Sequence, residues 1–524
     1  MTRLKSLIRT YSKELLLTFL SAALIVLSFP NFELTGFIFI AWLPFFFATR
    51  HKTPKEAFFL GALLGIFIAW GAFYWVAYTL HEFGQLPWVL AILLFFGFSL
   101  FCNIHLAIFA YVFQKIPFMR TSLFWAPILF TSIEAVFPQI FHWYLGACLY
   151  QKLWLVQFAD LTGVAGVTFF VILLNRCVFE IIIWVRKEIE IFPTYAFLVA
   201  LILFFLAGAY SIRKLQYYEA LIQRSPAIKA ALIQTNIGNM EKLQSTLGYY
   251  RSIDHLHAVN QRLVEQASQT PGLDLIVLPE TSVPGFFTKT HPLNEQRMLQ
   301  LAQRVNVPIY FGGYDLDEAG SVYNSAFLIS PYFQWLGTYR KIKLLVFGEY
   351  LPFAQTFPKL KEMFQTIGDF ARGTTQPVMT LSKERRFAPM ICFEGIFPDF
   401  VRRFVKRGAN FIVIITNDSW FGPTANPSQH LMLQVWRAIE NRTPVLRTAN
   451  TGITAFVDIT GKIRSRTSLF QETILVDQVA LIDQKTFFTL YGNVFIWILF
   501  GLLGVGGVNY FFYQRRNRNQ DLLK

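Results

Sequence analysis

Residues 275–280 read Leu-Ile-Val-Leu-Pro-Glu, a short apolar run that ends on the carboxylate of Glu280. The pattern recurs at residues 390–394, which read Met-Ile-Cys-Phe-Glu and place Cys392 at the end of another apolar run. Residues 415–422 repeat it around Asn417. Short apolar runs bounded by turn residues are typical of buried strands. Helical patterns separate the runs, and this alternation predicts an α/β domain.

We expect this domain to span residues 227–483 and to be long enough to bury a proper core. The expected strands are 228–234, 275–278, 308–312, 325–329, 388–392, 411–416, 445–448 and 454–459. The expected helices are 251–267, 293–305, 397–407 and 428–441.

The rest of the chain has a different character. Of the 524 residues, 54% are hydrophobic and only 15% are charged, whereas soluble proteins carry about 25% charged residues. Apolar stretches near the ~20 residues that cross a bilayer as a helix predict eight spans. They are 14–30, 34–49, 57–80, 88–113, 121–138, 164–185, 193–212 and 487–513. We therefore expect a seven-helix membrane domain (1–212), the α/β domain, an eighth helix and a basic tail (514–524).

The net charge of +15 is best explained by membrane topology, not by nucleic-acid binding. Lys and Arg near span ends stay on the cytoplasmic side. Basic residues occur before the first span, after every second span that follows, and in the tail. Both termini are then cytoplasmic, and residues 213–486 lie on the outer side.

Other features of the membrane half are less decisive. The first span lacks a small-residue cleavage site, so we expect a retained helix and not a signal peptide. Residues 137–160 are expected to form an interfacial or re-entrant stretch. Glu134 lies within a span, where a carboxylate is a functional hypothesis by default.

Neither a disulfide framework nor a cofactor is expected. The four Cys are few and scattered, and no CxxC pair occurs. The eight His show no HExxH spacing, and neither a GxGxxG nor a P-loop motif is present. We therefore expect no metal and no bound cofactor.

Three residue types at the strand ends suggest acyl transfer through a thioester. Besides Glu280 and Cys392, the third residue is Lys341, which lies between them in the sequence. Glu349 follows Lys341 by eight residues. Nearby backbone N–H groups and an ammonium favour a thiolate at Cys392. A carboxylate can take the thiol proton, and an ammonium can stabilise an oxyanion. Each residue alone is more often structural, but the three together favour catalysis.

These residues resemble the Glu, Lys, Cys triad of the carbon-nitrogen hydrolase (nitrilase) superfamily. Seven spans before such a domain and one after it resemble the bacterial apolipoprotein N-acyltransferase family, over essentially the whole chain. The resemblance implies a nitrilase-like sandwich inserted before the last span. It also implies that Glu280 is the general base, Lys341 the oxyanion stabiliser and Cys392 the nucleophile.

The resemblance implies supporting residues as well. They are Glu349, Glu394, Asn417 and Trp420. Phe286, Phe287, Phe347 and Phe393 are candidate substrate-binding residues, with loop packing as an equally good interpretation. Two positions depart from the family pattern: Val346 replaces a usual proline and Phe393 a usual tyrosine. We expect these departures to tune substrate preference.

By the same resemblance, Cys392 takes an acyl chain from a membrane phospholipid and passes it to the α-amine of an apolipoprotein's diacylglyceryl-cysteine. The expected partners are these two lipid substrates and membrane lipids, without nucleic acid, and the expected state is a monomer. The expected location is the bacterial inner membrane, with the catalytic domain periplasmic.

Two alternatives stay open from the sequence. A membrane-tethered nitrilase-type amidase would pass the thioester to water, because hydrolysis and transfer share the same triad. A catalytically silent scaffold or transporter would retain the fold without the chemistry.

Overall fold

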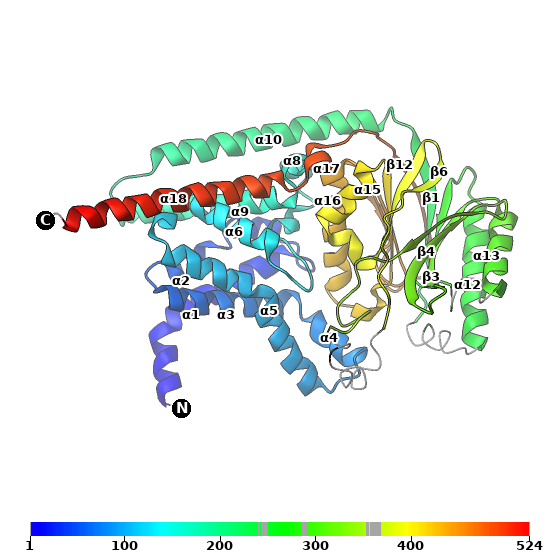
Figure 1. Cartoon of the computed structure of the whole chain (residues 1–524), viewed down its shortest axis with the longest axis horizontal. Coiled ribbons are helices and arrows are strands. Elements are labelled where there is room, and N and C mark those ends of the chain that lie inside the picture. The colour runs from blue at the N-terminus through cyan, green and yellow to red at the C-terminus, as the bar shows by residue number, and fades with distance from the viewer. Residues whose placement is uncertain are drawn as a thin grey trace. The chain divides into compact units, whose positions relative to one another are not determined.

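The computed structural model describes residues 2–238, 242, 250–283, 285, 292–352, 356 and 368–522 (Figure 1). The chain forms two compact units. The membrane unit comprises Met1–Tyr74, Ile92–Arg213 and Tyr491–Lys524, and the sandwich unit comprises Trp75–Ala91 and Lys214–Leu490.

Six helices in the described part of the chain are long and apolar enough to cross a membrane. They are α1 (Thr2–Ser28, apolar from Tyr11), α3 (Pro54–Ala72), α5 (Trp88–Lys115), α9 (Val164–Val185), α10 (Thr194–Ile222) and α18 (Val494–Leu522, apolar to Phe512). The expected spans 34–49 and 121–138 are shorter. The first divides into η1 (Thr35–Phe39) and α2 (Leu43–Thr49), and the second contains only α6 (Trp125–Val136), which follows η2 (Pro117–Arg120). The expected span 57–80 ends at Ala72, and α4 (Trp75–Glu82) follows as a separate helix of the sandwich unit.

One side chain binds the backbone groups at the break between η1 and α2. Asn175 of α9 accepts a hydrogen bond from the Trp42 backbone N–H at 2.9 Å and donates to the Ile38 carbonyl at 2.9 Å. Unpaired backbone groups are costly among apolar helices. The Asn175 amide therefore makes an interrupted helix acceptable there.

Residues 137–160 are likewise irregular, with η3 (Leu145–Leu149), α7 (Leu153–Val156) and α8 (Ala159–Thr162). The N-terminal N–H groups of η3 are bound by side chains. Glu134 Oε1 accepts from Leu145 N at 2.7 Å, and Thr168 Oγ1 accepts from Gly146 N at 3.0 Å. Glu134, whose role was open from the sequence, thus anchors this stretch within the membrane unit.

The sandwich unit contains two six-stranded sheets. The first has the order β12-β1-β2-β3-β4-β5 and the second β11-β10-β9-β8-β7-β6. The bounds of the first sheet are β1 (Ala227–Gln234), β2 (Leu275–Val277), β3 (Ile309–Leu316), β4 (Val322–Ile329), β5 (Trp335–Arg340) and β12 (Thr473–Ala480). Those of the second are β6 (Met379–Ser382), β7 (Arg385–Ile391), β8 (Phe411–Thr416), β9 (Val445–Ala449), β10 (Ala455–Val457) and β11 (Ile463–Arg466).

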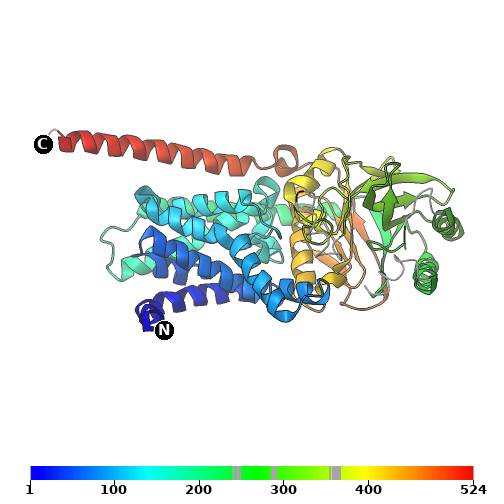
Figure 2. The same ribbon diagram turned by 60° about the horizontal axis from the view of Figure 1, so that its bottom comes forward.

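Helices cover the outer faces of both sheets (Figure 2). The first sheet packs its outer apolar side chains against α12 (Tyr250–Ser268) and α13 (Pro292–Val305), which share one buried cluster with its strands. The second sheet packs against α15 (Pro398–Lys406) and α16 (Asn426–Asn441). The predicted α/β sandwich is confirmed, and each expected strand lies on an observed one. Strands β5, β6, β11 and β12 were not expected from the sequence.

The strand directions determine where polar residues gather. β1, β2 and β3 run parallel in one sheet, and β7, β8 and β9 run parallel in the other. Parallel strands bring their carboxyl ends to one edge of a sheet. Glu280, Cys392 and Asn417 follow β2, β7 and β8 in that position.

Candidate active site

Glu280 lies in a tight turn beyond β2, with 5% of its surface exposed. The next residue, Thr281, has a φ of 49°, in the left-handed region. Strand β3 passes close by because residue 312 is glycine: a Cβ there would lie 2.7 Å from Glu280 Cα. The carboxylate accepts from Asn324 Nδ2 at 2.8 Å and from the Asn417 backbone N–H at 2.8 Å. Both of its oxygens are thus held in place.

Lys341 follows β5 and brings its ammonium to two carboxylates. Its Nζ lies 2.8 Å from Glu349 Oε1 and 3.4 Å from Glu280 Oε1. Asn324 Nδ2 donates to both of these oxygens, at 2.6 Å to Glu349 and 2.8 Å to Glu280. The structure therefore brings together Glu280, Lys341 and Glu349, as expected from the sequence.

The charge state of Lys341 follows from these neighbours. Burial alone would lower its pKa, but the carboxylates of Glu349 and Glu280 outweigh burial and raise the pKa above its ordinary value. The ammonium is fixed in its charged form at neutral pH.

Cys392 begins η4 (Cys392–Ile396), directly after β7, and has a φ of 54°. A non-glycine residue in this region stores strain, which is common at active sites. The side chains of Glu280 and Lys341 both act on the thiol electrostatically. The three candidate catalytic residues therefore share one buried site.

The surroundings of the thiol favour its protonated form, whereas the sequence pattern favoured a thiolate. Burial raises the pKa of Cys392, the Glu280 charge raises it further, and Lys341 and Thr416 only partly offset these effects. The effect of the Lys341 ammonium is thus smaller than the combined effects of burial, with Cys392 only 7% exposed, and of the Glu280 charge. The thiol needs a base at the moment of attack.

Glu394 connects the cysteine turn to the lysine loop. One oxygen accepts from Tyr339 Oη at 2.7 Å and from the backbone N–H groups of Ile342 and Lys343 at 2.7 and 3.0 Å. The other accepts from Ile391 N at 2.9 Å. Burial raises the pKa of Glu394 to about 7, although these hydrogen bonds lower it. Glu394 thus holds the residues beside Lys341 against those beside Cys392.

The two remaining supporting residues differ. Asn417 gives its backbone N–H to Glu280, and its side-chain oxygen accepts from Asn450 Nδ2 at 3.0 Å. Trp420 is 44% exposed and packs edge-on against Phe83 at 5.0 Å between ring centroids. The structure records no contact between Trp420 and Glu280, Lys341 or Cys392 among the described residues.

The four aromatic candidates also differ in placement. Phe347 is 53% exposed on the loop between Lys341 and Glu349. Phe393 is buried and packs edge-on against Phe397 at 4.9 Å between centroids. Phe286 and Phe287 lie outside the described residues.

Sequence reasoning missed several residues of the site. One of them is Asn324, whose amide bridges Glu280 and Glu349. The only sequence feature that could have identified it is its position as a polar residue near the start of an apolar strand. Tyr339 precedes Lys341 by two residues and reaches Glu394 only because β5 forms. Lys242 donates to the Glu280 carbonyl at 3.1 Å, and burial lowers its pKa to about 7.

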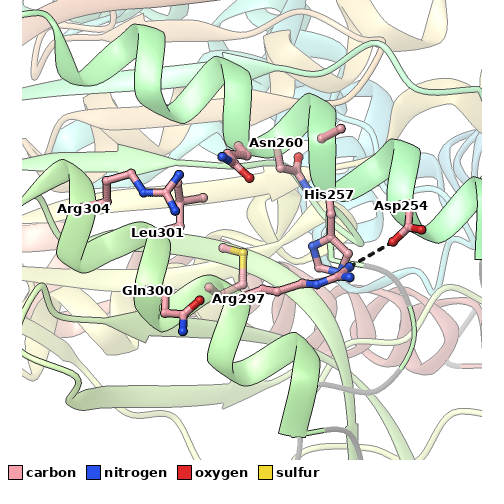
Figure 3. A pocket seen from close by; sticks show the side chains of 10 residues that line it. Asp254, His257, Asn260, Arg297, Gln300, Leu301 and Arg304 are labelled. Carbon is pink, nitrogen blue, oxygen red and sulfur yellow. Dashed lines mark hydrogen bonds and ion pairs between the residues drawn. The ribbon is translucent and has the colours of Figure 1, made fainter.

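A cavity of about 300 Å³ opens elsewhere, between α12 and α13 (Figure 3). Its lining mixes apolar residues such as Met298 and Leu301 with polar ones that include His257, Arg297 and Arg304. Both arginines are already paired, with Asp254 at 3.2 Å and Glu265 at 2.6 Å. No residue of the Glu280 site lines this cavity. The described residues contain no group of three or more His, Cys, Asp or Glu side chains that could hold a metal ion.

Comparisons with known proteins cover both units. Residues 229–485 match the family model described as carbon-nitrogen hydrolase, and residues 21–177 match the one described as apolipoprotein N-acyltransferase N-terminal domain. The chain is 34% identical to the apolipoprotein N-acyltransferase of Geobacter metallireducens over 93% of each chain. It is 30% identical to that of Bdellovibrio bacteriovorus, over 94% of this chain and 93% of the other. Among solved structures, the nitrilase-superfamily member Nit3 of Saccharomyces cerevisiae matches 48% of this chain and 90% of its own, with 18% identity and a TM-score of 0.37.

Proposed function

This chain belongs to the apolipoprotein N-acyltransferase family, and we propose that Glu280, Lys341 and Cys392 carry out its reaction. The protein is an acyltransferase of lipoprotein maturation. Its acyl donor is a membrane phospholipid and its acceptor an apolipoprotein. The observation that carries the residue assignment is the buried ammonium of Lys341 between the carboxylates of Glu280 and Glu349.

In the first half-reaction, Glu280 takes the proton of the Cys392 thiol as the sulfur attacks the ester carbonyl carbon of the phospholipid. A carbon–sulfur bond forms, and the carbonyl oxygen becomes an oxyanion that the Lys341 ammonium stabilises. When this intermediate collapses, the ester carbon–oxygen bond breaks. Glu280 returns the proton to the leaving oxygen, so that a lysophospholipid departs and an acyl-thioester remains.

The second half-reaction reverses these roles with a different nucleophile. The free α-amine of the apolipoprotein's diacylglyceryl-cysteine attacks the thioester carbon, and Glu280 takes a proton from the nitrogen. A carbon–nitrogen bond forms and the carbon–sulfur bond breaks. Protonation of the sulfur by Glu280 regenerates the thiol, in line with its raised pKa.

The remaining polar residues position these three. Glu349 keeps Lys341 charged and oriented, and Asn324 sets the separation of the two carboxylates. Glu394 holds the Lys341 loop to the cysteine turn. Phe347, with Phe286, Phe287 and Phe393, is proposed to shape the substrate entrance, and the Val346 and Phe393 departures to tune substrate preference.

The proposed topology keeps eight spans, with residues 34–49 and 121–138 crossing as interrupted or short helices. Both termini are then cytoplasmic, residues 227–483 lie in the periplasm, and the protein acts as a monomer in the bacterial inner membrane. Two lipid-anchored substrates favour this arrangement, because an enzyme that acts on both needs its cysteine at the level of the headgroups. Labelling of single introduced cysteines at residues 85 and 190 from either side of the membrane tests it: residue 85 is expected outside and residue 190 inside.

Mass spectrometry of the acceptor tests the reaction. An apolipoprotein incubated with membranes that contain the protein should gain one acyl chain on its N-terminal amine, with release of lysophospholipid. Free fatty acid with an unmodified acceptor would instead identify a hydrolase. Unchanged transfer by Cys392→Ala would refute the role of this cysteine.

A further inference from the structure

Four buried polar side chains with no part in the chemistry above form a network that reaches the nucleophile turn. They are Asp418 of η5 (Asp418–Phe421), His430 and Gln434 of α16, and Arg447 of β9. Each is at most 2% exposed. Buried ionic groups are costly, so a full set of partners is expected for them.

The four side chains form a closed network. Arg447 donates to Asp418 Oδ2 at 2.6 Å through a terminal nitrogen and to Gln434 Oε1 at 2.6 Å through Nε. His430 Nδ1 lies 3.0 Å from Asp418 Oδ1. Although burial opposes it, Arg447 and His430 lower the pKa of Asp418 well below its ordinary value. Asp418 is thus ionised, and its charge is matched by Arg447.

The network ends on the backbone of the nucleophile. Gln434 Nε2 donates to the Cys392 carbonyl at 3.1 Å, and His430 Nε2 lies 3.3 Å from the same carbonyl and 2.7 Å from Gln434 Nε2. Because ionised Asp418 only accepts hydrogen bonds, the His430 proton belongs on Nδ1, and Nε2 can accept from Gln434. The amide of Gln434 is therefore oriented at both ends, with its oxygen toward Arg447 and its nitrogen toward Cys392.

This anchor acts on a strained residue. The left-handed φ of 54° at Cys392 is unfavourable for a non-glycine residue and persists only where its surroundings impose it. Gln434 also packs closely against the nucleophile turn. A Cβ on Gly395, three residues after Cys392, would lie 3.1 Å from Gln434 Nε2.

We propose that Gln434 is a positioning residue that holds the Cys392 carbonyl, and with it the thiol, in the orientation needed for attack. Arg447, Asp418 and His430 hold Gln434 in turn. The inference deepens the proposed function, on which it rests for the role of Cys392.

The test compares one substitution at two buried glutamines of α16. Gln434→Glu keeps the shape of the side chain and its pairing with Arg447 but loses the donor to Cys392. Gln429→Glu is the matched control. Gln429 is also buried, and its Oε1 accepts from Trp75 Nε1 at 3.0 Å, a bond that a carboxylate keeps.

Alkylation of Cys392 by iodoacetamide, followed over pH by peptide mass spectrometry in the full-length membrane protein, is the primary readout. Gln434→Glu should lower the alkylation rate and the kcat of acyl transfer by at least about tenfold, with little change in KM for the phospholipid. Gln429→Glu should react as the wild type does. If Gln434→Glu fails to insert, Gln434→Met, which introduces no charge, takes its place with the same expectation.

Alkylation and kcat at wild-type levels in the Gln434 variants would overturn the proposal, as would an equal loss in Gln429→Glu. Alkylation uses no lipid, so it is independent of the proposed reaction. Acyl transfer by Cys392→Ala would refute the proposed function and leave the alkylation comparison valid.

Discussion

The carboxylate of Glu280 accepts a hydrogen bond from the backbone N–H of Asn417, 2.8 Å away. Glu280 follows a strand of one sheet, and Asn417 follows a strand of the other. This hydrogen bond therefore holds the proposed base from the opposite sheet of the sandwich. It can form only when the side chain at position 280 has an oxygen to accept it.

Glu280→Gln should slow both half-reactions. The amide cannot take a proton, and general-base catalysis typically contributes about 10²–10⁴-fold. Single-turnover labelling with a radiolabelled phospholipid measures the first step, and transfer from preformed acyl-enzyme measures the second. Wild-type turnover in both assays would rule out Glu280 as the base.

Lys341→Ala should abolish detectable acyl-enzyme while the protein still inserts in the membrane. The variant removes the oxyanion stabiliser and leaves Glu280 and Glu349 without their shared cation. Lys343→Ala is a suitable control, because Lys343 is exposed two residues away. Normal acyl-enzyme accumulation in Lys341→Ala would contradict the oxyanion role.

Glu394 should make stability depend on pH. Its pKa rises from an ordinary 4.5 to about 7 in the folded protein, so the folded state favours the protonated form. The contribution of Glu394 to the free energy of unfolding is complete below pH ~4.5. It is lost as the pH rises through about 7, a change on the order of 3 kcal/mol.

Thermal unfolding in detergent between pH 4.5 and 7.5 measures this effect. The wild type should lose more stability over that range than Glu394→Gln, which cannot titrate. The same variant should transfer acyl chains more slowly, because an amide nitrogen would face one of the N–H or O–H donors. Parallel pH profiles for the two proteins would exclude a raised pKa at Glu394.

Glu134→Leu should destabilise the membrane unit by about 1–3 kcal/mol, because it leaves the buried Leu145 N–H without an acceptor. Glu134→Gln retains a carbonyl oxygen and should lose less. Thermal midpoints of both variants in detergent decide this. Equal midpoints for Glu134→Leu and the wild type would show that the contact contributes no stability.

Much of the candidate site was predictable from the sequence, because its residues occupy recognisable positions at strand ends. Glu280, Cys392 and Asn417 each follow a short buried strand, and parallel strands bring such residues to one edge. Glu349 was predictable from its distance of eight residues from Lys341. The raised pKa of Cys392 was not predictable, because it depends on the burial of the residue and on the charge of Glu280.

Contacts between distant residues were beyond the sequence. Nothing in the sequence distinguishes Asn324 and Gln434 from other amide residues. Their importance follows from β4 and α16, which place them beside Glu280 and Cys392. The interrupted span 34–49 looked continuous, because an apolar run carries no sign that Asn175, more than a hundred residues away, satisfies a break at Trp42. Trp420 was grouped with the site by its neighbourhood in the sequence, whereas its ring packs against Phe83.

The most direct test of the account is to trap the acyl-enzyme and map the modified residue. Membranes containing the protein are given a phospholipid without an apolipoprotein, quenched in acid, digested and analysed by mass spectrometry. The account predicts one acyl chain on the peptide carrying Cys392, removable by neutral hydroxylamine as a thioester should be. An acyl chain on another residue, or acyl transfer that persists in Cys392→Ala, would contradict it.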